Sequence, residues 1–488
     1  MGENLTLFAA EFNRSIVVEA RPERLSSEAG AIIVREVIER LGITDWLAER
    51  IVDRRRLDLI THPLSELLNT TLVLLAQGWR DQDDADALRD DAVLRLSVSE
   101  RRGISPLETR PRKEGQPLDK NPPVPDGLAS QPTLSRLVAM LSTDENRPRV
   151  REALLEMAAR RMGAGRSGHR MRYLTIDIDS LPVEVHGHQP GSQYNGHYHA
   201  RIYHPLVASV AETGDLLDVQ LRNGAVHTAN GALEFIMPLL DRVEARLCQV
   251  AAVRIDAGFP DEKVLGAMEA RRTPYVARVK NNPVLDRMAE PYLKRPPGRP
   301  PTEPRMWFHE LTYRAESWSR ERRVILVVQE RPDELFLHYF WLITNWTIDQ
   351  MSGEELLEHY RERGSAEGHM GELMDVFDPA LSSSPRPKST YRGQRITTCA
   401  PSCDSFAHNE TILLLNALAF NVAHTARVLL ESATNEGWSL RRMRERVLRV
   451  AARVLVHGRR AVLVIGEASA SLWRALWSRL RLLRLAET

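Results

Sequence analysis

The chain has 488 residues, of which 43% are hydrophobic and 27% charged, a composition typical of a globular protein rather than a disordered or fibrous one. Its 66 basic and 65 acidic residues leave a net charge of +1, so the total charge neither indicates nor excludes a nucleic-acid partner. No apolar run reaches about 18 residues, and the start MGENLTLFAAEFNRS lacks the pattern of a signal peptide. We therefore expect no membrane span and no signal peptide. The three cysteines are too few for a disulfide framework and favour a reducing cytoplasm.

The first part of the chain carries apolar residues at helical spacing, most clearly over residues 30–51 and 64–77. We predict a helical N-terminal region over 1–103. Residues 104–127 are rich in proline and charge, which is typical of a linker. A further helix is expected over about 132–164.

The pattern changes at MRYLTIDIDSLPVEV, residues 171–185, which alternates as a strand does. From there the candidates follow as three strands, helix, strand, helix and strand, which predicts an α/β core with an antiparallel hairpin on a partly parallel sheet. Three strand-like, aromatic segments come next, after the basic run KRPPGRPPTEPR. The predicted divisions are a first core part over 128–285, a β-strand insertion domain over 286–350, a second core part over 351–430 and a helical C-terminal region over 431–488.

Two acids, Asp177 and Asp179, lie two residues apart in the first strand, so both carboxylates point to the same face of the sheet. Asp256 ends the later strand VAAVRIDAGF, and strand ends are where open α/β sheets place their sites. If the two strands are neighbours, Asp179 and Asp256 face each other. We expect no side-chain counter-charge for these acids, so a divalent cation is the expected partner, and carboxylate oxygens suit Mg²⁺.

The helix predicted after the insertion carries Tyr360, Arg363 and Glu367 at positions i, i+3 and i+7, which share one helical face. Glu367 would supply a third carboxylate for a two-metal phosphoryl-transfer site, and Arg363 could contact a phosphate. Taken alone, Glu367 is an ordinary solvated residue on a charged helix. Its neighbours Glu358, Glu362 and Glu372 are competing candidates.

Two strand acids, a β insertion and a helix with Y-x2-R-x3-E resemble the DDE transposases of bacterial insertion sequences. The sequence is most similar to insertion sequence family 1380, in the subgroup with the Y-R-E-K signature. The resemblance continues in order through GWRDQDDADALRDD, LASQPTLSRL, DIDS, YHPL, AETGD, RNGAVHTANGA, RIDAGF, YRERGSAE and NETILLLNALAFNVAH, and so covers nearly the whole chain. It implies an RNase H-like catalytic core interrupted by a β-rich insertion. It also implies an enzyme that cuts transposon ends and joins the 3′-hydroxyl to target DNA.

The resemblance assigns the metal-binding acids to Asp179, Asp256 and Glu367, with two Mg²⁺ ions or Mn²⁺ in their place. It assigns DNA contacts to Tyr360 and Arg363. The implied partner is double-stranded DNA, both the terminal inverted repeats and the target, bound by a homodimer. The implied location is the bacterial cytoplasm, at the nucleoid when acting.

Several alternatives stay open. Asp177 competes with Asp179 as the first acid. The signature lysine would fall seven residues after Glu367, where this chain has Met374, and that departure removes one phosphate contact. A metal-dependent nuclease without strand transfer, or a catalytically inactive DNA-binding protein, would share most of these motifs. Cys399 and Cys403 could ligate a metal, but two ordinary loop thiols are the simpler interpretation.

Five histidines lie within 19 residues, at His186, His188, His197, His199 and His204. They could bind a transition metal, but a loop beside the active site that contacts DNA backbone is the favoured interpretation. The run KRPPGRPPTEPR fits either a minor-groove arm or a plain basic linker.

Overall fold

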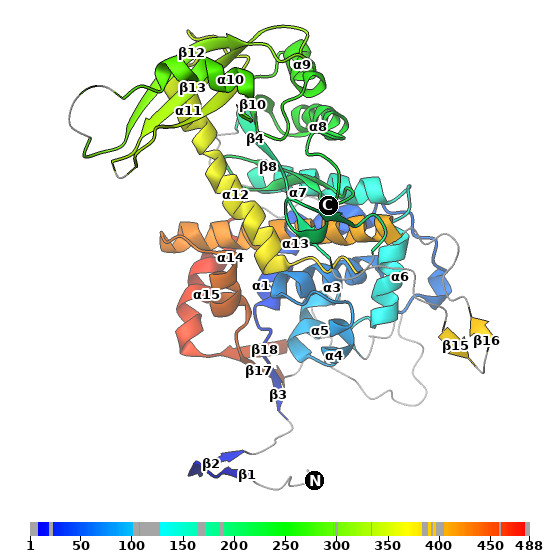
Figure 1. Cartoon of the computed structure of the whole chain (residues 1–488). Coiled ribbons are helices and arrows are strands. Elements are labelled where there is room, and N and C mark those ends of the chain that lie inside the picture. The colour runs from blue at the N-terminus through cyan, green and yellow to red at the C-terminus, as the bar shows by residue number, and fades with distance from the viewer. Residues whose placement is uncertain are drawn as a thin grey trace, which may run out of the picture.

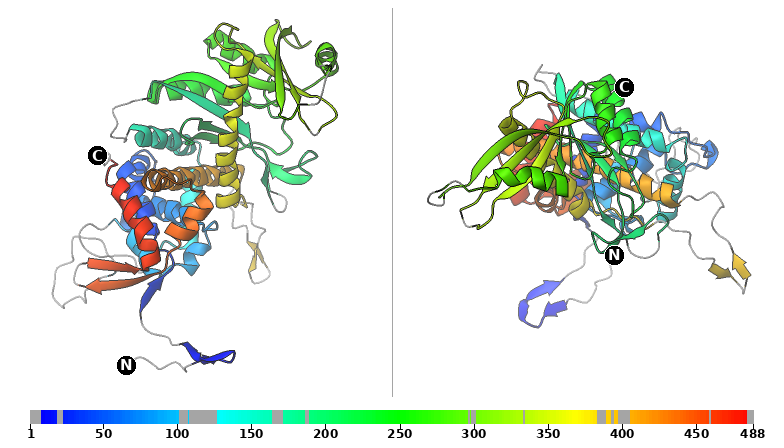
Figure 2. Two further views of the ribbon diagram at one scale, coloured as in Figure 1. Left: turned by 90° about the vertical axis from the view of Figure 1, so that its left-hand side faces the viewer. Right: turned by 45° about the horizontal axis from the view of Figure 1, so that its top comes forward.

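The computed structural model describes residues 8–18, 23–100, 107, 127–163, 171–185, 189–295, 297, 301–332, 334–382, 389–391, 394–396, 405–457 and 460–483. Figure 1 shows a large sheet with its helices at one end of the molecule and a body of helices at the other. The helical body combines the N-terminal and C-terminal parts of the chain, which lie side by side in Figure 1 and in the left-hand view of Figure 2.

The helices, with their short 3-10 and π segments, are α1 (Ala31–Leu41), α2 (Ile43–Ala48), η1 (Leu57–Leu59), α3 (Leu64–Gln77), α4 (Asp84–Ala87), α5 (Ala92–Val98), α6 (Gln131–Leu141), α7 (Arg147–Gly163), α8 (Ala232–Arg246), α9 (Glu262–Arg271), α10 (Pro283–Ala289), η2 (Glu290–Tyr292), α11 (Gly353–Arg361), α12 (Arg363–Glu372), η3 (Leu373–Phe377), α13 (Ser405–Thr434), α14 (Leu440–Met443), η4 (Arg444–Leu448) and α15 (Glu467–Leu480).

The strands are β1 (Phe8–Ala10), β2 (Asn13–Val18), β3 (Arg24–Ser26), β4 (Tyr173–Ser180), β5 (Val183–Glu184), β6 (Gln193–Asn195), β7 (Ala200–Tyr203), β8 (Leu206–Val210), β9 (Leu216–Gln220), β10 (Gln249–Ile255), β11 (Tyr275–Val279), β12 (Arg305–Tyr313), β13 (Arg322–Glu330), β14 (His338–Thr344), β15 (Ser389–Tyr391), β16 (Gln394–Ile396), β17 (Ala452–His457) and β18 (Arg460–Ile465).

The main sheet has eight strands in the order β12-β13-β14-β11-β10-β4-β8-β9. Strands β4, β10 and β11 run parallel, and β8 and β9 add to β4 as an antiparallel hairpin. Helix α8 leads from β9 back to β10, and α9 joins β10 to β11. This is the mixed α/β arrangement that the order of strand and helix candidates predicted. It places the C-terminal ends of β4 and β10 next to each other.

The three strands within the predicted insertion extend the same sheet rather than forming a separate one. Strand β14 pairs antiparallel with β11, and β13 and β12 follow it outward. Successive side chains of β13 point to opposite faces of the sheet, and both sets are buried. Val324, Leu326 and Val328 join the core under α8 to α10, whereas Ile325 and Val327 contact α11 on the opposite face.

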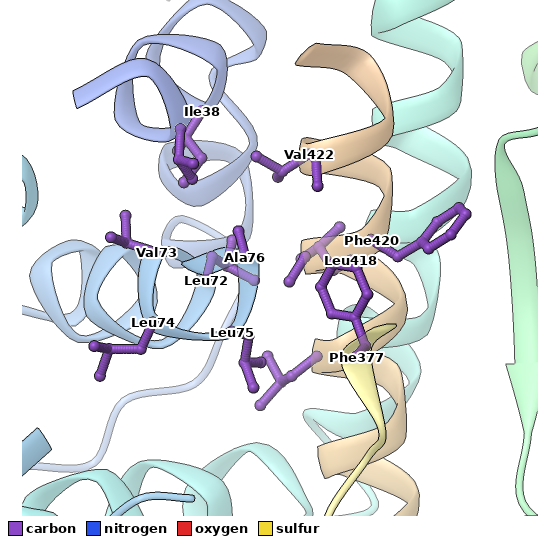
Figure 3. Close-up of a cluster of buried hydrophobic side chains, with 14 of the residues drawn as sticks. Ile38, Leu72, Val73, Leu74, Leu75, Ala76, Phe377, Leu418, Phe420 and Val422 are labelled. Carbon is purple, nitrogen blue, oxygen red and sulfur yellow. The ribbon is translucent and has the colours of Figure 1, made fainter. Parts of the chain in front are cut away.

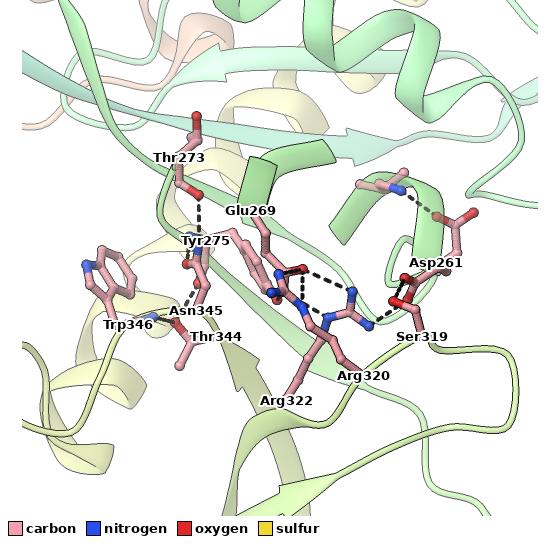
Figure 4. A network of polar contacts seen from close by, with 12 residues as sticks. Asp261, Glu269, Thr273, Tyr275, Ser319, Arg320, Arg322, Thr344, Asn345 and Trp346 are labelled. Atoms are coloured by element: carbon pink, nitrogen blue, oxygen red, sulfur yellow. Dashed lines mark hydrogen bonds and ion pairs between the residues drawn. The ribbon is translucent and has the colours of Figure 1, made fainter. Parts of the chain in front are cut away.

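A polar network fastens this extension to the rest of the sheet (Figure 4). Arg322, at the start of β13, has a side chain only 2% exposed and forms ion pairs with Glu262 and Glu269 of α9. Asn345 accepts from the backbone amide of Tyr275 and donates to the carbonyl of Thr273. These contacts lie at the N-terminal end of β11, the end of the sheet away from Asp256.

The helical body is built around α13, a 30-residue helix that α3 crosses (Figure 3). Leu72, Ala76, Leu418 and Val422 are among the fully buried residues at this crossing. Within the described residues, α13 is the one helix long and apolar enough to cross a membrane by length and composition, and 83% of its most apolar window is buried inside the structure. Burial in the core accounts for its composition.

The helix that follows the extension connects the two bodies. In Figures 1 and 2, α11 and α12 form one long rod from the sheet to the helical body. Ser352 and Glu355 form a capping box at its start, and it ends in the π turn η3, where Phe377 is buried beside Phe420 of α13. Tyr360, Arg363 and Glu367 therefore lie on a helix held at both ends.

Two expectations about secondary structure are wrong. The region 431–488 is not helical throughout, because β17 and β18 form an antiparallel hairpin. The N-terminal region likewise begins with strands, and β3 pairs with β17 across more than 400 residues of sequence. The hairpin sequences ARVLVH and RAVLVI do alternate with period two, a strand signal that the surrounding helical pattern outweighed.

Candidate active site

The parallel pairing of β4 and β10 brings two of the predicted acids together. Arg254 is opposite Asp177, and Ile255 is opposite Ile178. Carried one residue further, this register places Asp256 beside Asp179 at the C-terminal ends of the two strands. The two carboxylates are close enough for the charge of Asp256 to contribute to the raised pKa of Asp179.

Asp177 has a side-chain partner, so the expectation that both strand acids lack one is wrong. Arg254 of β10 donates from Nε and Nη2 to the two carboxylate oxygens of Asp177, at 2.6 and 2.7 Å, and both side chains are 1% exposed. Arg254 also donates from Nη1 to the carbonyl of His359 at 2.7 Å and contacts Glu362 at 3.1 Å. The pair therefore joins β4, β10 and the α11–α12 rod.

Asp179 differs from Asp177 in its surroundings. Its pKa is raised to about 6, chiefly by burial and also by the charges of Asp256 and Glu367, against the opposing effects of Arg363 and of the amide of Ser180. That amide donates to Oδ1 of Asp179 at 2.8 Å. A carboxylate with other carboxylates nearby is a group that a cation would stabilise.

Arg363 lies between two of the acids. Its Nη2 donates to Oδ2 of Asp179 and its Nη1 donates to Oε1 of Glu367, each at 2.5 Å. The guanidinium is buried, with 7% of its side chain exposed, whereas Glu367 is 58% exposed. Burial alone would lower the pKa of Arg363, but the charges of Asp179, Tyr360, Asp256 and Glu367 hold it above its usual range.

The structure thus brings together all five residues predicted for the site. Tyr360 is near this group, since the charges of Arg363, Asp256 and Glu367 all act on its phenol, whose pKa is raised chiefly by burial. The i, i+3, i+7 spacing on the rod accounts for the common face.

A network of buried polar groups anchors α12 on its other side. Arg427 of α13 forms an ion pair with Glu372 and donates to Nδ1 of His369 at 3.0 Å and to Nδ1 of His424 at 2.5 Å. Nε2 of His424 is 2.6 Å from the carbonyl of Thr213, in the β8–β9 turn. The orientation of α12, and so of Glu367, is fixed by these contacts to α13 and the sheet.

The turn AETGD has a glycine because α12 approaches it closely. Gly214 has φ of +74°, and a Cβ at this position would lie 2.7 Å from the imidazole of His369. The following residue, Asp215, is buried, accepts from Thr213 and forms an ion pair with Arg161.

Two loops border the acids. Thr228, in the loop after β9, lies 3.5 Å from the hydroxyl of Ser180 and packs on Gly258, where a Cβ would lie 2.8 Å from that of Thr228. On the other side, Tyr198 follows β6. Burial and the charges of Asp179 and Asp256 raise its pKa. Tyr198 was not among the predicted site residues, and only its position in the histidine-rich run pointed to it.

The donor set is that of a hard cation, but the carboxylates are not gathered around one point. Among the residues that the structure describes, no group of three or more histidines, cysteines, aspartates or glutamates is arranged to hold a metal ion. Arg363 supplies the positive charge between Asp179 and Glu367 instead. Carboxylate oxygens such as those of Asp179, Asp256 and Glu367 are the kind of ligand that a divalent cation takes.

The other residues singled out in the sequence are not part of the group formed by the three acids, Arg363 and Tyr360. Met374, at the position of the signature lysine, lies in η3 and packs against the core of the helical body. His204 is buried, and His197 contacts Tyr198 at a ring-centroid distance of 4.8 Å. His186, His188, Cys399 and Cys403 lie outside the described residues.

Taken together, a mixed sheet with acids at the ends of two adjacent parallel strands, and a third acid on a helix that crosses them, defines an α/β protein with an acidic strand-end site. The chain belongs to the family of the transposase DDE domain, group 1, whose sequence model matches residues 8–383. That range includes both strand acids and Glu367.

Among solved structures, the piggyBac transposase synaptic complex with hairpin DNA is similar, at 11% sequence identity and a TM-score of 0.39, over 94% of this chain and 86% of that chain. No curated protein matches the chain.

Proposed function

We propose that this protein is a cut-and-paste DNA transposase of the insertion sequence family 1380 type, with an RNase H-like core and a catalytic triad of Asp179, Asp256 and Glu367. The observation that carries the proposal is the convergence of these three acids with Arg363 and Tyr360. Family membership supports an enzyme that acts on DNA. The order β9-β8-β4-β10-β11, antiparallel on one side of β4 and parallel on the other, supports the RNase H-like core.

The reaction has two phosphoryl transfers. In the first, the oxygen of water attacks the phosphorus at the transposon end, and the bond to O3′ breaks and leaves a 3′-hydroxyl. In the second, that hydroxyl attacks a phosphorus of target DNA and displaces another O3′. Neither step needs a covalent enzyme intermediate, so the residues of the chain contribute mainly by positioning.

Asp179, Asp256 and Glu367 would hold the Mg²⁺ ions, or Mn²⁺ in their place. Such ions supply positive charge to the attacking and leaving oxygens. Arg363 and Tyr360 would contact the phosphate beside the acids, the guanidinium through paired N–H groups and the phenol through one O–H. We propose that the chain binds terminal inverted repeats and target DNA as a homodimer in the cytoplasm.

Cleavage of a pre-nicked duplex tests the proposal. The duplex carries the inverted repeat that flanks the coding sequence, and Mg²⁺ or Mn²⁺ is supplied. Asp179→Asn, Asp256→Asn and Glu367→Gln should each lose at least 100-fold in cleavage while retaining DNA binding. The matched control is Glu358→Gln, an exposed acid on the same rod, which should cleave normally. Full activity in any of the three variants would remove that residue from the triad.

The same assay separates the alternatives. Cleavage without joining to a second duplex would indicate a nuclease. DNA binding without cleavage in either metal would indicate an inactive DNA-binding protein, the alternative that Met374 favours.

A further inference from the structure

Arg363 occupies the position between two acids where the family's chemistry requires a cation. Its two Nη groups each lie 2.5 Å from a carboxylate oxygen, one on Asp179 and one on Glu367. A guanidinium that bridges two carboxylates neutralises them, as a divalent cation would. In this arrangement the two kinds of cation compete for the same oxygens.

The bridging position leaves part of Arg363 unsatisfied. Its Nε is buried and has no hydrogen-bond partner among the described residues. An unpaired buried donor costs free energy, so the guanidinium is not fully satisfied by the two carboxylates. A phosphate offers several acceptor oxygens to the same fork of N–H groups.

We propose that Arg363 is an internal counter-ion that keeps the affinity of the acids for divalent cations low until a DNA phosphate withdraws it. The phosphate takes over the N–H groups of Arg363, and Asp179 and Glu367 are then free to bind a cation. Phosphate binding and cation binding therefore favour each other, and the coupling is reciprocal. This inference rests on the proposed function for the source of the phosphate, but its first test needs no DNA.

The first test is Mn²⁺ binding to the full-length, metal-free chain without DNA, followed by the electron paramagnetic resonance signal of free Mn²⁺. Arg363→Gln should bind Mn²⁺ about tenfold more tightly than the wild type, because one adjacent positive charge shifts carboxylate equilibria by about one order of magnitude or more. Arg363→Lys should fall between them, since one ammonium group cannot bridge both acids as a fork does. The control Arg361→Gln, whose guanidinium contacts Met306, should match the wild type.

Adding Asp179→Asn to Arg363→Gln should abolish the gain in Mn²⁺ affinity, which would show that the gain arises at these acids. Circular dichroism establishes that each variant is folded. The proposal would be overturned if folded Arg363→Gln bound Mn²⁺ no more tightly than the wild type.

The second test measures Mn²⁺ affinity with and without a duplex oligonucleotide, after subtraction of the Mn²⁺ bound by DNA alone. Duplex should increase the affinity of the wild type and leave that of Arg363→Gln unchanged. No increase in the wild type would overturn the role of phosphate. Failure of the proposed function is distinguishable, because a chain that never cleaves DNA would still show the DNA-free gain in Arg363→Gln.

Discussion

Arg254 and Asp177 form a two-pronged ion pair between adjacent parallel strands, entirely inside the protein. Two residues further along β4, Asp179 receives a single N–H group of Arg363, which it shares with Glu367, and the charge of Asp256 acts on it as well. The same strand face therefore carries one acid that receives two N–H groups of a buried arginine and one that shares its arginine with a second acid. From this contrast we expect a structural role for Asp177 and keep Asp179 as the candidate for function.

The contrast predicts that two similar substitutions affect different properties, the first the stability of the protein and the second its cleavage activity. Asp177→Asn should lower the free energy of unfolding by about 3 kcal/mol, because it leaves the charge of Arg254 buried without its partner. Asp179→Asn should change it by less than about 1 kcal/mol and abolish cleavage. Urea denaturation at pH 7 measures the first quantity. Equal destabilisation by both substitutions would contradict the assignment.

His424 predicts a dependence of stability on pH. Burial lowers its pKa to about 3 from an ordinary value of 6.5, and Arg427 already donates to its Nδ1. Between these values the unfolded chain binds a proton that the folded chain does not, so stability is full above pH 6.5 and falls as the pH drops toward 3. This one group contributes a slope of up to about 1.4 kcal/mol per pH unit.

The measurement is the free energy of unfolding of the wild type and His424→Gln at several values between pH 7.5 and 4.5. The variant cannot titrate at this position and should show a shallower slope. Equal slopes of the free energy of unfolding against pH in the two proteins would mean that His424 does not control stability in this pH range.

Two glycines should respond differently to alanine. Gly214→Ala places a Cβ against His369 in a left-handed backbone and should destabilise by at least about 1 kcal/mol. Gly371→Ala, on α12 with open space around it, should be neutral or stabilising by up to about 1 kcal/mol. Because Gly214 contacts the helix of Glu367, its variant should also lose cleavage activity at temperatures where it remains folded. Thermal denaturation and cleavage assays give the two quantities.

Arg322 predicts a purely structural effect at the far end of the sheet. Arg322→Met leaves Glu269 without its most buried partner and should cost about 3 kcal/mol of stability. Cleavage per folded molecule should not change, because the acids lie at the opposite strand ends. Arg331→Met, at an arginine that is 48% exposed and paired with Glu334, is the control and should change stability by less than about 0.5 kcal/mol.

The alternation of residues 171–185 was sufficient to predict the first core strand, and the spacing of Tyr360, Arg363 and Glu367 was sufficient to predict that they share one face of a helix. Both signals are local, because strand faces repeat every two residues and helix faces every 3.6. The resemblance to the DDE transposases, rather than either local signal, predicted that Asp179, Asp256, Glu367, Tyr360 and Arg363 share one region. Their roles in catalysis and DNA contact stay predictions.

The sequence could not reveal the partners of those residues. Arg254 lies 77 residues from Asp177, and Arg363 lies 184 residues from Asp179. A counter-charge supplied by another strand or helix depends on register and topology, which no local pattern contains. For the same reason, β17 was not recognised as the partner of β3, since the pairing joins opposite ends of the chain.

The rod of α11 and α12 makes the site sensitive to distant movement. Glu367 lies 14 residues beyond Gly353, about 21 Å along the axis of an α-helix. A tilt of about 3° at the start of the rod would therefore displace Glu367 by about 1 Å, a misplacement that can cost about 100-fold in rate. The packing of α11 on β12 at the start of the rod and the contacts of Arg427 near its end therefore both determine the position of Glu367 from a distance.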